Sequence, residues 1–390
     1  MQAYPPCGCV SSGVGICYNQ DVKDEVSTRL VSLDILRGLD MFVLVVVGPF
    51  VMALDRTFSL PAAVRWQFGH HFYGFTFWDV IMPLFIFMCG AAVPFALGRR
   101  MDENGRPKPG FWRHVLSRFA LLWFLGLVAQ GQLLSLDPLM INPFNNTLQA
   151  IASGYLIAAV VLLVPSRRVQ IAVPIVLALA YAAALAVGND YSRTGNVAIR
   201  FENWFTALIT PKGSHAVDPH NRYTWWLSVP MFGAMTLCGS EAARILKSAV
   251  APFVRLRRLT ILGAVLLAVG WLVSPVIPVS KHISTLSFSA QAMGWCCLAL
   301  AVLYWLTDIR KIRRGMGLFV LFGQTALLAY MSIEVFGDVF AAFAAFVMRG
   351  VPHLLGPKAM PLACWLAQSV LLVFVLMYRR EFVAAKKRGK

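Results

Sequence analysis

Residues 76–97 read TFWDVIMPLFIFMCGAAVPFAL, a run of 22 residues in which Asp79 is the one charged side chain. A helix of about 20 mostly apolar residues is long enough to cross the roughly 30 Å hydrocarbon core of a bilayer. A segment that faces lipid must satisfy its own backbone hydrogen bonds, and a helix does so. This stretch therefore predicts a transmembrane helix.

The rest of the chain has the same apolar character. Of its 390 residues, 58% are hydrophobic and 14% are charged, whereas soluble globular proteins have roughly 45–50% and about 25%. This composition excludes a soluble fold and a disordered chain. The apolar stretch 338–356 is broken by Gly350 and Pro352, and it is either an eleventh span or a re-entrant or interfacial segment. We predict an all-helical bundle of ten transmembrane helices, over residues 35–54, 76–97, 115–134, 147–165, 170–188, 224–246, 259–279, 289–307, 317–337 and 361–378.

The positive charges predict how the bundle is oriented. Lys and Arg total 35 against 18 Asp and Glu, which gives a net charge of +17. If the connections between predicted spans alternate between the two sides, 26 of the 35 cations fall on the side that carries both termini. Cytoplasmic loops of membrane proteins carry the excess of Lys and Arg. We therefore predict cytoplasmic termini, contact of the basic face with anionic lipid, and no nucleic-acid partner.

We expect one transmembrane domain over residues 29–380, between a flexible cytoplasmic tail, 1–28, and a basic cytoplasmic tail, 381–390. The longest extracytoplasmic connection, 189–223, is too short for an independent enzyme domain. The cysteines and histidines do not have the spacing of a metal site, so we predict no metal. Any chemistry must then take place within the bundle or at its edges.

Polar groups at membrane depth are functional candidates, and the first group lies at the start of the first span. Asp34 and Arg37 are three residues apart, so they lie on the same face of a helix. One interpretation is a structural ion pair. The other is that Arg37 and Asp34, beside Arg99 and Arg100 of the next predicted cytoplasmic loop, bind a phosphorylated ligand.

The second group precedes the second span at its predicted extracytoplasmic end. His70 and His71 are adjacent there, and His70 lies nine residues before Asp79. Histidine titrates near neutral pH, and it can accept a proton from an amine or hydroxyl that attacks an acyl carbon. In this hypothesis Asp79 orients an imidazole or stays ionised beside the acceptor. The alternative is a pair of interfacial histidines among aromatic neighbours.

The third group follows the seventh predicted span, on the same side of the membrane as His70. Irregular backbone at membrane depth is tolerated where it faces protein or water, so this segment either lines an acceptor cleft or forms a plain loop. In the ninth span, Gln324 either contacts substrate or forms a hydrogen bond with a neighbouring helix. The candidate substrate-binding residues of the segment are Lys281, Ser284, Thr285 and Ser287.

Four stretches of sequence carry a resemblance to a known family. They are RLVSLDILRGLDMF (29–42), QFGHHFYGFTFWDVIMPLFIFMCGAAVPFAL (67–97), IPVSKHISTLSF (277–288) and LFGQTALLAY (321–330). In order and approximate spacing they resemble the heparan-alpha-glucosaminide N-acetyltransferase family, and in particular its bacterial members. The resemblance extends over residues 29–380.

The resemblance implies a multi-pass acetyltransferase in the inner membrane of a bacterium. Such an enzyme takes acetyl-CoA from the cytoplasm and acetylates an amino sugar or another glycan on the far side. The resemblance implies that His70, or the adjacent His71, is the active-site histidine, and that Arg37 faces the nucleotide end of coenzyme A. Direct transfer and a transient acyl-histidine are both compatible with these residues. Members of the family tend to be dimers, which implies a homodimer.

One position departs from the family pattern. The lysosomal enzymes have a catalytic Asn late in the first span, and this chain has Gly48 there. Glycine has no side chain with which to bind substrate or polarise a thioester, so a catalytically altered family member is one alternative. The other is a transporter or flippase for a sugar or an acylated metabolite, because buried charges such as Asp34 and Glu334 suit a substrate pathway. The sequence shows no inverted repeat of the transporter type.

Overall fold

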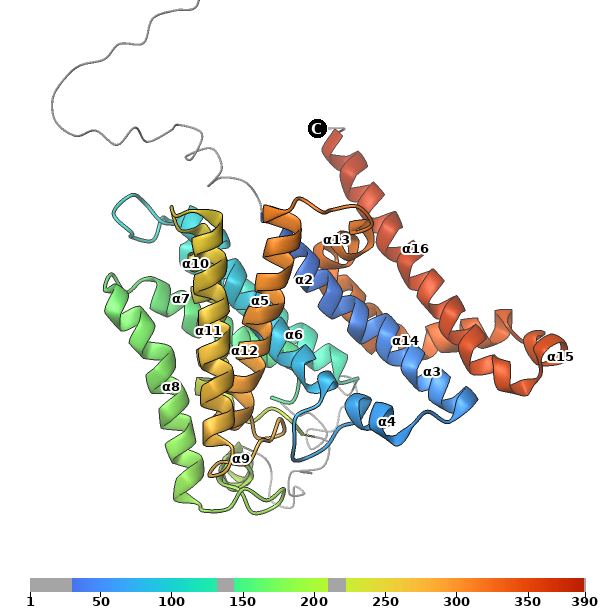
Figure 1. Cartoon of the computed structure of the whole chain (residues 1–390), viewed down its shortest axis with the longest axis horizontal. Coiled ribbons are helices and arrows are strands. Elements are labelled where there is room, and N and C mark those ends of the chain that lie inside the picture. The colour runs from blue at the N-terminus through green and yellow to red at the C-terminus, as the bar shows by residue number, and fades with distance from the viewer. Residues whose placement is uncertain (1–29, 132–143, 210–221, 389–390) are drawn as a thin grey trace, which may run out of the picture.

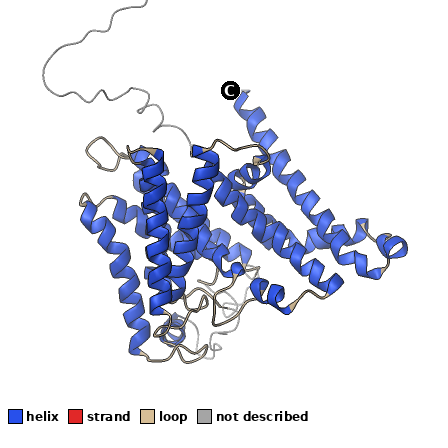
Figure 2. Ribbon diagram, viewed as in Figure 1, coloured by secondary structure: helices blue, strands red, loops and turns tan. Residues whose placement is uncertain are grey.

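The computed structural model describes residues 30–131, 144–209 and 222–388 (Figure 1). In this part of the chain every regular element is a helix (Figure 2). Outside the helices, a single isolated antiparallel bridge joins Met101 to Pro107. The predicted all-helical class is therefore confirmed. The N-terminal tail lies outside the described residues, as does the end of the predicted span 115–134.

Among the described residues, eight helical segments are long and apolar enough to cross a membrane. The chain is therefore an integral multi-pass membrane protein. The segments are Val31–Phe58 (α2, Val31–Phe42; η1, Val43–Val47; α3, Gly48–Phe58), Phe77–Arg100 (η2, Phe77–Val80; α5, Ile81–Ala96; η3, Gly98–Arg100), Phe111–Ala129 (α6), Arg167–Val187 (α8), Pro252–Val273 (α11), Leu286–Ile309 (α12, Leu286–Leu303; η5, Tyr304–Ile309), Ala326–Val347 (α14) and Pro357–Glu381 (η6, Pro357–Ala359, and most of α16, Met360–Arg388).

Two further predicted spans coincide with helices that are shorter or more polar. The predicted span 147–165 corresponds to α7 (Thr147–Leu162), which has 16 residues. The predicted span 224–246 corresponds to η4 and α10 (Val229–Lys247), and α10 has Arg244 and Lys247 in its last turn. The remaining elements are shorter helices: α4 (Ala62–Phe68), α9 (Val197–Ile209), η4 (Trp226–Ser228), α13 (Gly317–Gln324) and α15 (Val351–Leu355).

The predicted span 317–337 is divided into two helices. α13 ends at Gln324 and α14 begins at Ala326, and Thr325 between them has φ −115° and ψ 21°, outside the helical range. The Thr325 hydroxyl donates to the carbonyl of Leu321 at 2.8 Å, a local bond that competes with regular helix geometry. α14 then continues to Val347, so the first part of the stretch 338–356 belongs to this helix.

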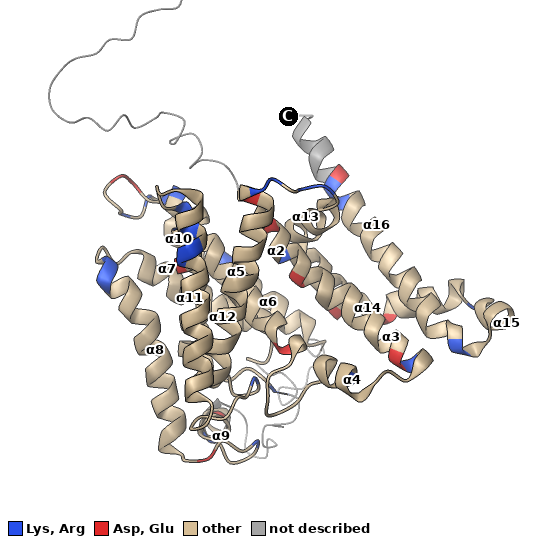
Figure 3. Ribbon diagram, in the orientation of Figure 1, with Lys and Arg blue, Asp and Glu red and all other residues tan. Residues whose placement is uncertain are grey.

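Lys and Arg gather at one end of the bundle (Figure 3). This end contains the start of α2, the junction of α10 with α11, and the connection from η5 to α13. The charge pattern of the sequence predicts that these three segments share one membrane face. We call this end of the bundle the cation-rich end. Its assignment to the cytoplasm stays a prediction.

The span that the bundle encloses most, Phe77–Arg100, packs closely against α10 through its helix α5. A Cβ atom at Gly90 would lie 1.8 Å from the carbonyl oxygen of Thr236, and one at Gly239 would lie 2.0 Å from that of Phe87. The hydroxyl of Ser240 donates to the Gly90 carbonyl at 2.8 Å. Small residues let helices approach closely in a membrane, where apolar burial does not drive association. This contact fixes the position of α5, whose N-terminal end directly follows η2 and Asp79.

Candidate functional site

The loop after α4 places the two adjacent histidines in different surroundings. His71 stacks on Trp66 with ring centroids 3.6 Å apart, and its Nε2 lies 3.2 Å from the Trp66 carbonyl oxygen. His70 instead faces a cavity, where its ring lies 6.5 Å from that of Trp78, centroid to centroid. The resemblance placed the active-site histidine at His70 and left His71 as the alternative, and of the two it is His70 that lines the cavity.

The cavity beside His70 has a volume of about 430 Å³. We call it the histidine cavity. Segments far apart in the sequence form its wall, because η2, α5, α7, α14 and the loop after α11 meet here. Apolar side chains of α5 line one side of it. Its polar lining includes two imidazoles, an ammonium and three hydroxyl groups, from His70, His282, Lys281, Thr147, Tyr223 and Tyr330.

Asp79 forms an ion pair with Lys281. The Nζ atom of Lys281 lies 3.3 Å from Oδ1 of Asp79, and both residues are buried. The other carboxylate oxygen accepts hydrogen bonds from the backbone N–H of Thr76 at 3.1 Å and from its hydroxyl at 2.8 Å. The Asp79 carboxylate thus contacts Thr76 and Lys281, and its role beside an imidazole or the acceptor stays a prediction. Asp79 caps η2 and holds the Lys281 ammonium in the cavity wall.

The hydroxyl groups that follow Lys281 stabilise their own loop. Ser284, Thr285 and Ser287 are at most 2% exposed, and none of them lines the histidine cavity. The Thr285 hydroxyl accepts from the Ser280 N–H at 3.0 Å, and the Ser287 hydroxyl donates to a backbone carbonyl of the same loop at 3.2 Å. Irregular backbone at membrane depth must have its polar groups satisfied by protein. The predicted contact of these three hydroxyls with an acceptor is therefore corrected.

His282 is a residue of this site that the sequence did not reveal. Its Nδ1 lies 3.0 Å from the carbonyl oxygen of Arg222, and its ring stacks on Phe72 with centroids 5.4 Å apart. The guanidinium of Arg222 is itself buried and pairs with Glu202 at 2.7 Å. The only signal in the sequence is that His282 directly follows Lys281.

The electrostatics of the histidine cavity keep His70 neutral at pH 7. Partial burial disfavours the charged imidazolium and the Lys281 ammonium repels it, so the pKa of His70 falls from 6.5 to about 4. Burial also lowers the pKa of Lys281, although Asp79 opposes this change. A neutral imidazole can accept a proton. Among the described residues, no cluster of three or more His, Cys, Asp or Glu side chains is placed to hold a metal ion.

A second cavity, of about 330 Å³, is lined by residues of α2, α5, α6, α7, α13 and α14. We call it the arginine cavity, because Arg37 of α2 and Arg118 of α6 both line it. The guanidinium of Arg118 also lies over the ring of Tyr155, 5.0 Å from its centroid. Gln324 lines this cavity and not the histidine cavity, and its contact with a substrate stays a prediction.

The other predicted ligand-binding residues lie apart from the arginine cavity. Arg99 and Arg100 are exposed in η3, and Asp34 is half-buried in α2, and none of the three is in the cavity lining. The sequence predicts Arg99 and Arg100 beside Arg37, whereas in the structure Arg118 lines the arginine cavity together with Arg37. Sequence reasoning missed Arg118 because it used this residue only as one of the cations that orient the bundle, although the residue lies within the predicted span 115–134 and within α6, which begins at Phe111.

The two cavities are stacked along the bundle and share a wall. On α5, Ile81 and Met82 line the histidine cavity, and Met88 lines the arginine cavity. The shared wall consists of three side chains that line both cavities, Phe85, Thr147 and Tyr330.

Gly48 lies against an aromatic side chain of the histidine cavity. A Cβ atom at this position would lie 2.2 Å from Cη2 of Trp78, and Trp78 lines the cavity. The indole therefore occupies the space into which a side chain at position 48 would project. In this chain the indole of Trp78, and not a side chain at position 48, lines the histidine cavity there.

No curated protein matches the sequence of this chain. A protein-family model described as a domain of unknown function, DUF5009, matches residues 29–191. The matched region contains both arginines of the arginine cavity and also His70, whereas Lys281 and Tyr330 lie beyond it. Over residues 29–191 the chain is thus similar to the DUF5009 family.

Proposed function

We propose that this protein is a transmembrane acyltransferase. In this proposal it moves an acetyl group from cytoplasmic acetyl-CoA to an amino sugar or another glycan on the extracytoplasmic side of a bacterial inner membrane. The observation that carries the proposal is the stacking of a cavity with two guanidinium groups against a cavity with a neutral imidazole. The resemblance to the heparan-alpha-glucosaminide N-acetyltransferase family supports the same reaction.

The arginine cavity suits the donor substrate. Guanidinium groups bind phosphate through paired, charge-assisted hydrogen bonds, and Arg37 and Arg118 both line this cavity. Its remaining lining is largely apolar and includes Met41 and Met88, which suits an uncharged pantetheine chain. The acetyl group would then reach the shared wall, where Tyr330 separates the arginine cavity from the histidine cavity.

The histidine cavity suits the acceptor and the transfer step. The acceptor nitrogen or oxygen attacks the thioester carbonyl carbon while its proton passes to His70. The bond between carbon and sulfur then breaks, and the coenzyme A thiolate takes a proton. The Lys281 ammonium is the donor in the cavity wall that can stabilise negative charge on the carbonyl oxygen. A transient acyl-histidine on His70 is the alternative route.

Acetyl transfer and coenzyme A binding test this proposal separately. With the purified protein in vesicles, radiolabelled acetyl-CoA and a glucosaminide acceptor, we expect His70→Ala to abolish transfer and to retain coenzyme A binding by calorimetry. His71→Ala is the matched control, because His71 stacks on Trp66 outside the cavity. Full transfer activity of His70→Ala would refute the proposed role.

Three variants, one of them a control, test the donor site. Arg37→Ala and Arg118→Ala should each weaken coenzyme A binding at least about tenfold, the loss expected for a charged hydrogen bond. Arg99→Ala should leave it unchanged, because Arg99 is exposed and outside the cavity. Equal effects of all three substitutions would mean that coenzyme A binds elsewhere.

A transporter or flippase is the second candidate function. The observation that favours it is a continuous series of polar side chains across two stacked cavities, which includes Glu334 in the histidine cavity. A transporter of free sugars would not bind coenzyme A, so the calorimetric experiment separates the two functions. Binding of coenzyme A without transfer to any acceptor would indicate a catalytically altered family member.

A further inference from the structure

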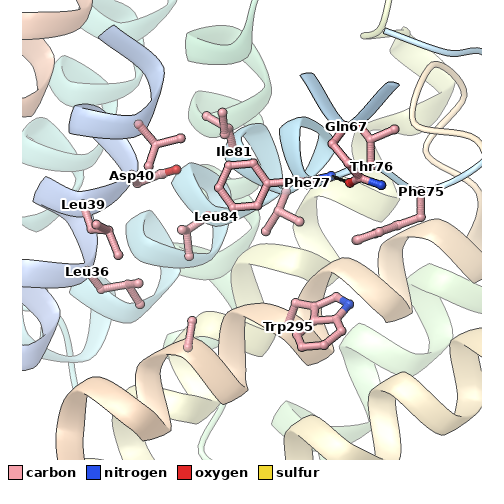
Figure 4. A pocket seen from close by; sticks show the side chains of 13 residues that line it. Leu36, Leu39, Asp40, Gln67, Phe75, Thr76, Phe77, Ile81, Leu84 and Trp295 are labelled. Carbon is pink, nitrogen blue, oxygen red and sulfur yellow. Dashed lines mark hydrogen bonds between the residues drawn. The ribbon is translucent and has the colours of Figure 1, made fainter. Parts of the chain in front are cut away.

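A third cavity lies between α2, α5 and α12, and Ile81 separates it from the histidine cavity (Figure 4). We call it the Asp40 cavity. It has a volume of about 420 Å³, within the range of roughly 300–1,000 Å³ that is typical of small-molecule sites. Its wall is nearly all apolar. Phe77 and Trp295 line it and are 48% and 44% exposed on the outside of the bundle, where a bilayer would surround them.

Among the described residues of this lining, Asp40 is the one with an ionisable side chain. The residue is 2% exposed, and Figure 4 shows its carboxyl group directed into the cavity. Its Oδ2 atom has no hydrogen-bond partner among the described residues. Asp40 follows Val31 by nine positions along α2, which places it about 14 Å from the start of the helix. The carboxyl group therefore lies well inside the span.

The other polar side chains of this lining are already engaged. Oε1 of Gln67 accepts a hydrogen bond from the Phe77 N–H at 2.9 Å, and the Thr76 hydroxyl donates to Asp79 at 2.8 Å. Within the described part of the chain, no Lys, Arg or His lines this cavity. A buried carboxylate is stable only when a cation or several donors compensate for its lost hydration. The surrounding protein supplies neither to Oδ2 of Asp40.

We propose that the Asp40 cavity binds an amphiphilic amine that enters from the bilayer. Its hydrocarbon body lies against the apolar wall, including Leu84 and Trp295, and its ammonium group contacts the Asp40 carboxylate. Charge complementarity selects this ligand class. A plain hydrocarbon chain would leave the carboxylate unpaired, and an anionic lipid would place a second negative charge beside it. This site is separate from the proposed acetyl transfer, so either proposal can fail alone.

Quenching of Trp295 fluorescence by a brominated ligand tests this proposal. The probe is 12-bromododecylamine, added to the purified full chain in nanodiscs, with 12-bromododecane as the probe that lacks the amine. We expect the amine to quench at concentrations at least about tenfold lower, the difference expected from a charge-assisted hydrogen bond. In Trp295→Phe this amine-specific quenching should disappear.

Two further variants test whether Asp40 and this cavity cause the amine-specific quenching. Asp40→Asn keeps the shape of the side chain, and we expect it to remove the difference between the two probes. Ala299→Phe keeps Asp40 and fills the cavity, and we expect it to weaken quenching by both probes, so the test stands even if Asp40→Asn does not fold. Equal quenching by the two probes, or an unchanged difference in Asp40→Asn, would overturn the proposal.

Discussion

The ammonium group of Lys281 lies 3.3 Å from the carboxylate of Asp79 in the wall of the histidine cavity. Asp79 belongs to η2 at the start of α5, and Lys281 belongs to the loop after α11. The pair therefore joins two distant segments at the rim of the candidate site. Both residues are buried, and the positive charge next to His70 contributes to its lowered pKa.

Removal of one partner of this pair should destabilise the protein. We expect Lys281→Met to lower the free energy of unfolding by about 3–5 kcal/mol, because it leaves the buried Asp79 charge unpaired. The double variant Lys281→Met with Asp79→Leu should recover much of this loss. Thermal unfolding in detergent measures the difference. Arg65 and Asp55 are an exposed control pair, 3.9 Å apart, where Arg65→Met should cost less than about 1 kcal/mol.

The pH dependence of transfer should follow the titration of His70. Because its pKa is about 4, we expect activity to be retained at pH 5 and to fall as the pH drops through 4. In Lys281→Met the midpoint should move upward, since one cause of the lowered pKa is removed. A pH–rate profile measures the midpoint of activity, and an NMR titration of labelled histidine measures the pKa of His70. An unchanged midpoint in the variant would contradict the proposed electrostatic coupling.

The same titration affects stability. The pKa of His70 is lower in the folded protein than its ordinary value of 6.5, so the unfolded chain binds this proton at a higher pH. The stability linked to His70 is therefore fully present above pH 6.5 and is lost as the pH falls from 6.5 towards 4. We expect the unfolding temperature of the native chain to fall more over this window than that of His70→Gln.

A side chain at position 48 should compete with Trp78. We expect Gly48→Asn to reduce stability by about 1–3 kcal/mol, the usual cost of overpacking, because its Cβ atom would lie 2.2 Å from the indole. The double variant Gly48→Asn with Trp78→Ala makes room for the amide. It should unfold at a higher temperature than Trp78→Ala alone. A single variant that is as stable as the native chain would show that the indole can move aside freely.

The contact between α5 and α10 should not tolerate a methyl group. Gly90→Ala places a Cβ atom 1.8 Å from a backbone oxygen, which no rotamer change can relieve, and we expect a loss of at least about 2 kcal/mol. Gly337→Ala is the matched control, because that glycine lies in α14 with nothing within 4 Å of the new atom. It should leave the unfolding temperature unchanged or raise it, by up to about 1 kcal/mol of helix propensity.

The membrane class of this protein could be predicted from the sequence because it depends on local properties. The length and apolarity of a segment such as 76–97 determine whether it can span a bilayer, and the structure contains the helix Phe77–Arg100 there. The break at Thr325 was not predictable in the same way. Residues 317–337 are mostly apolar on both sides of Thr325, and the hydrophobic pattern carries no information about a helix that ends and restarts there.

The sequence by itself also identified which polar residues occur at membrane depth, including His70, Asp79 and Lys281. Only the tertiary structure decided how they are paired. It placed Lys281 beside Asp79, stacked His71 on Trp66, and brought Arg118 rather than Arg99 to Arg37. The physical reason is that a polar group at membrane depth requires a partner, and that partner comes from whichever distant helix or loop packs beside it.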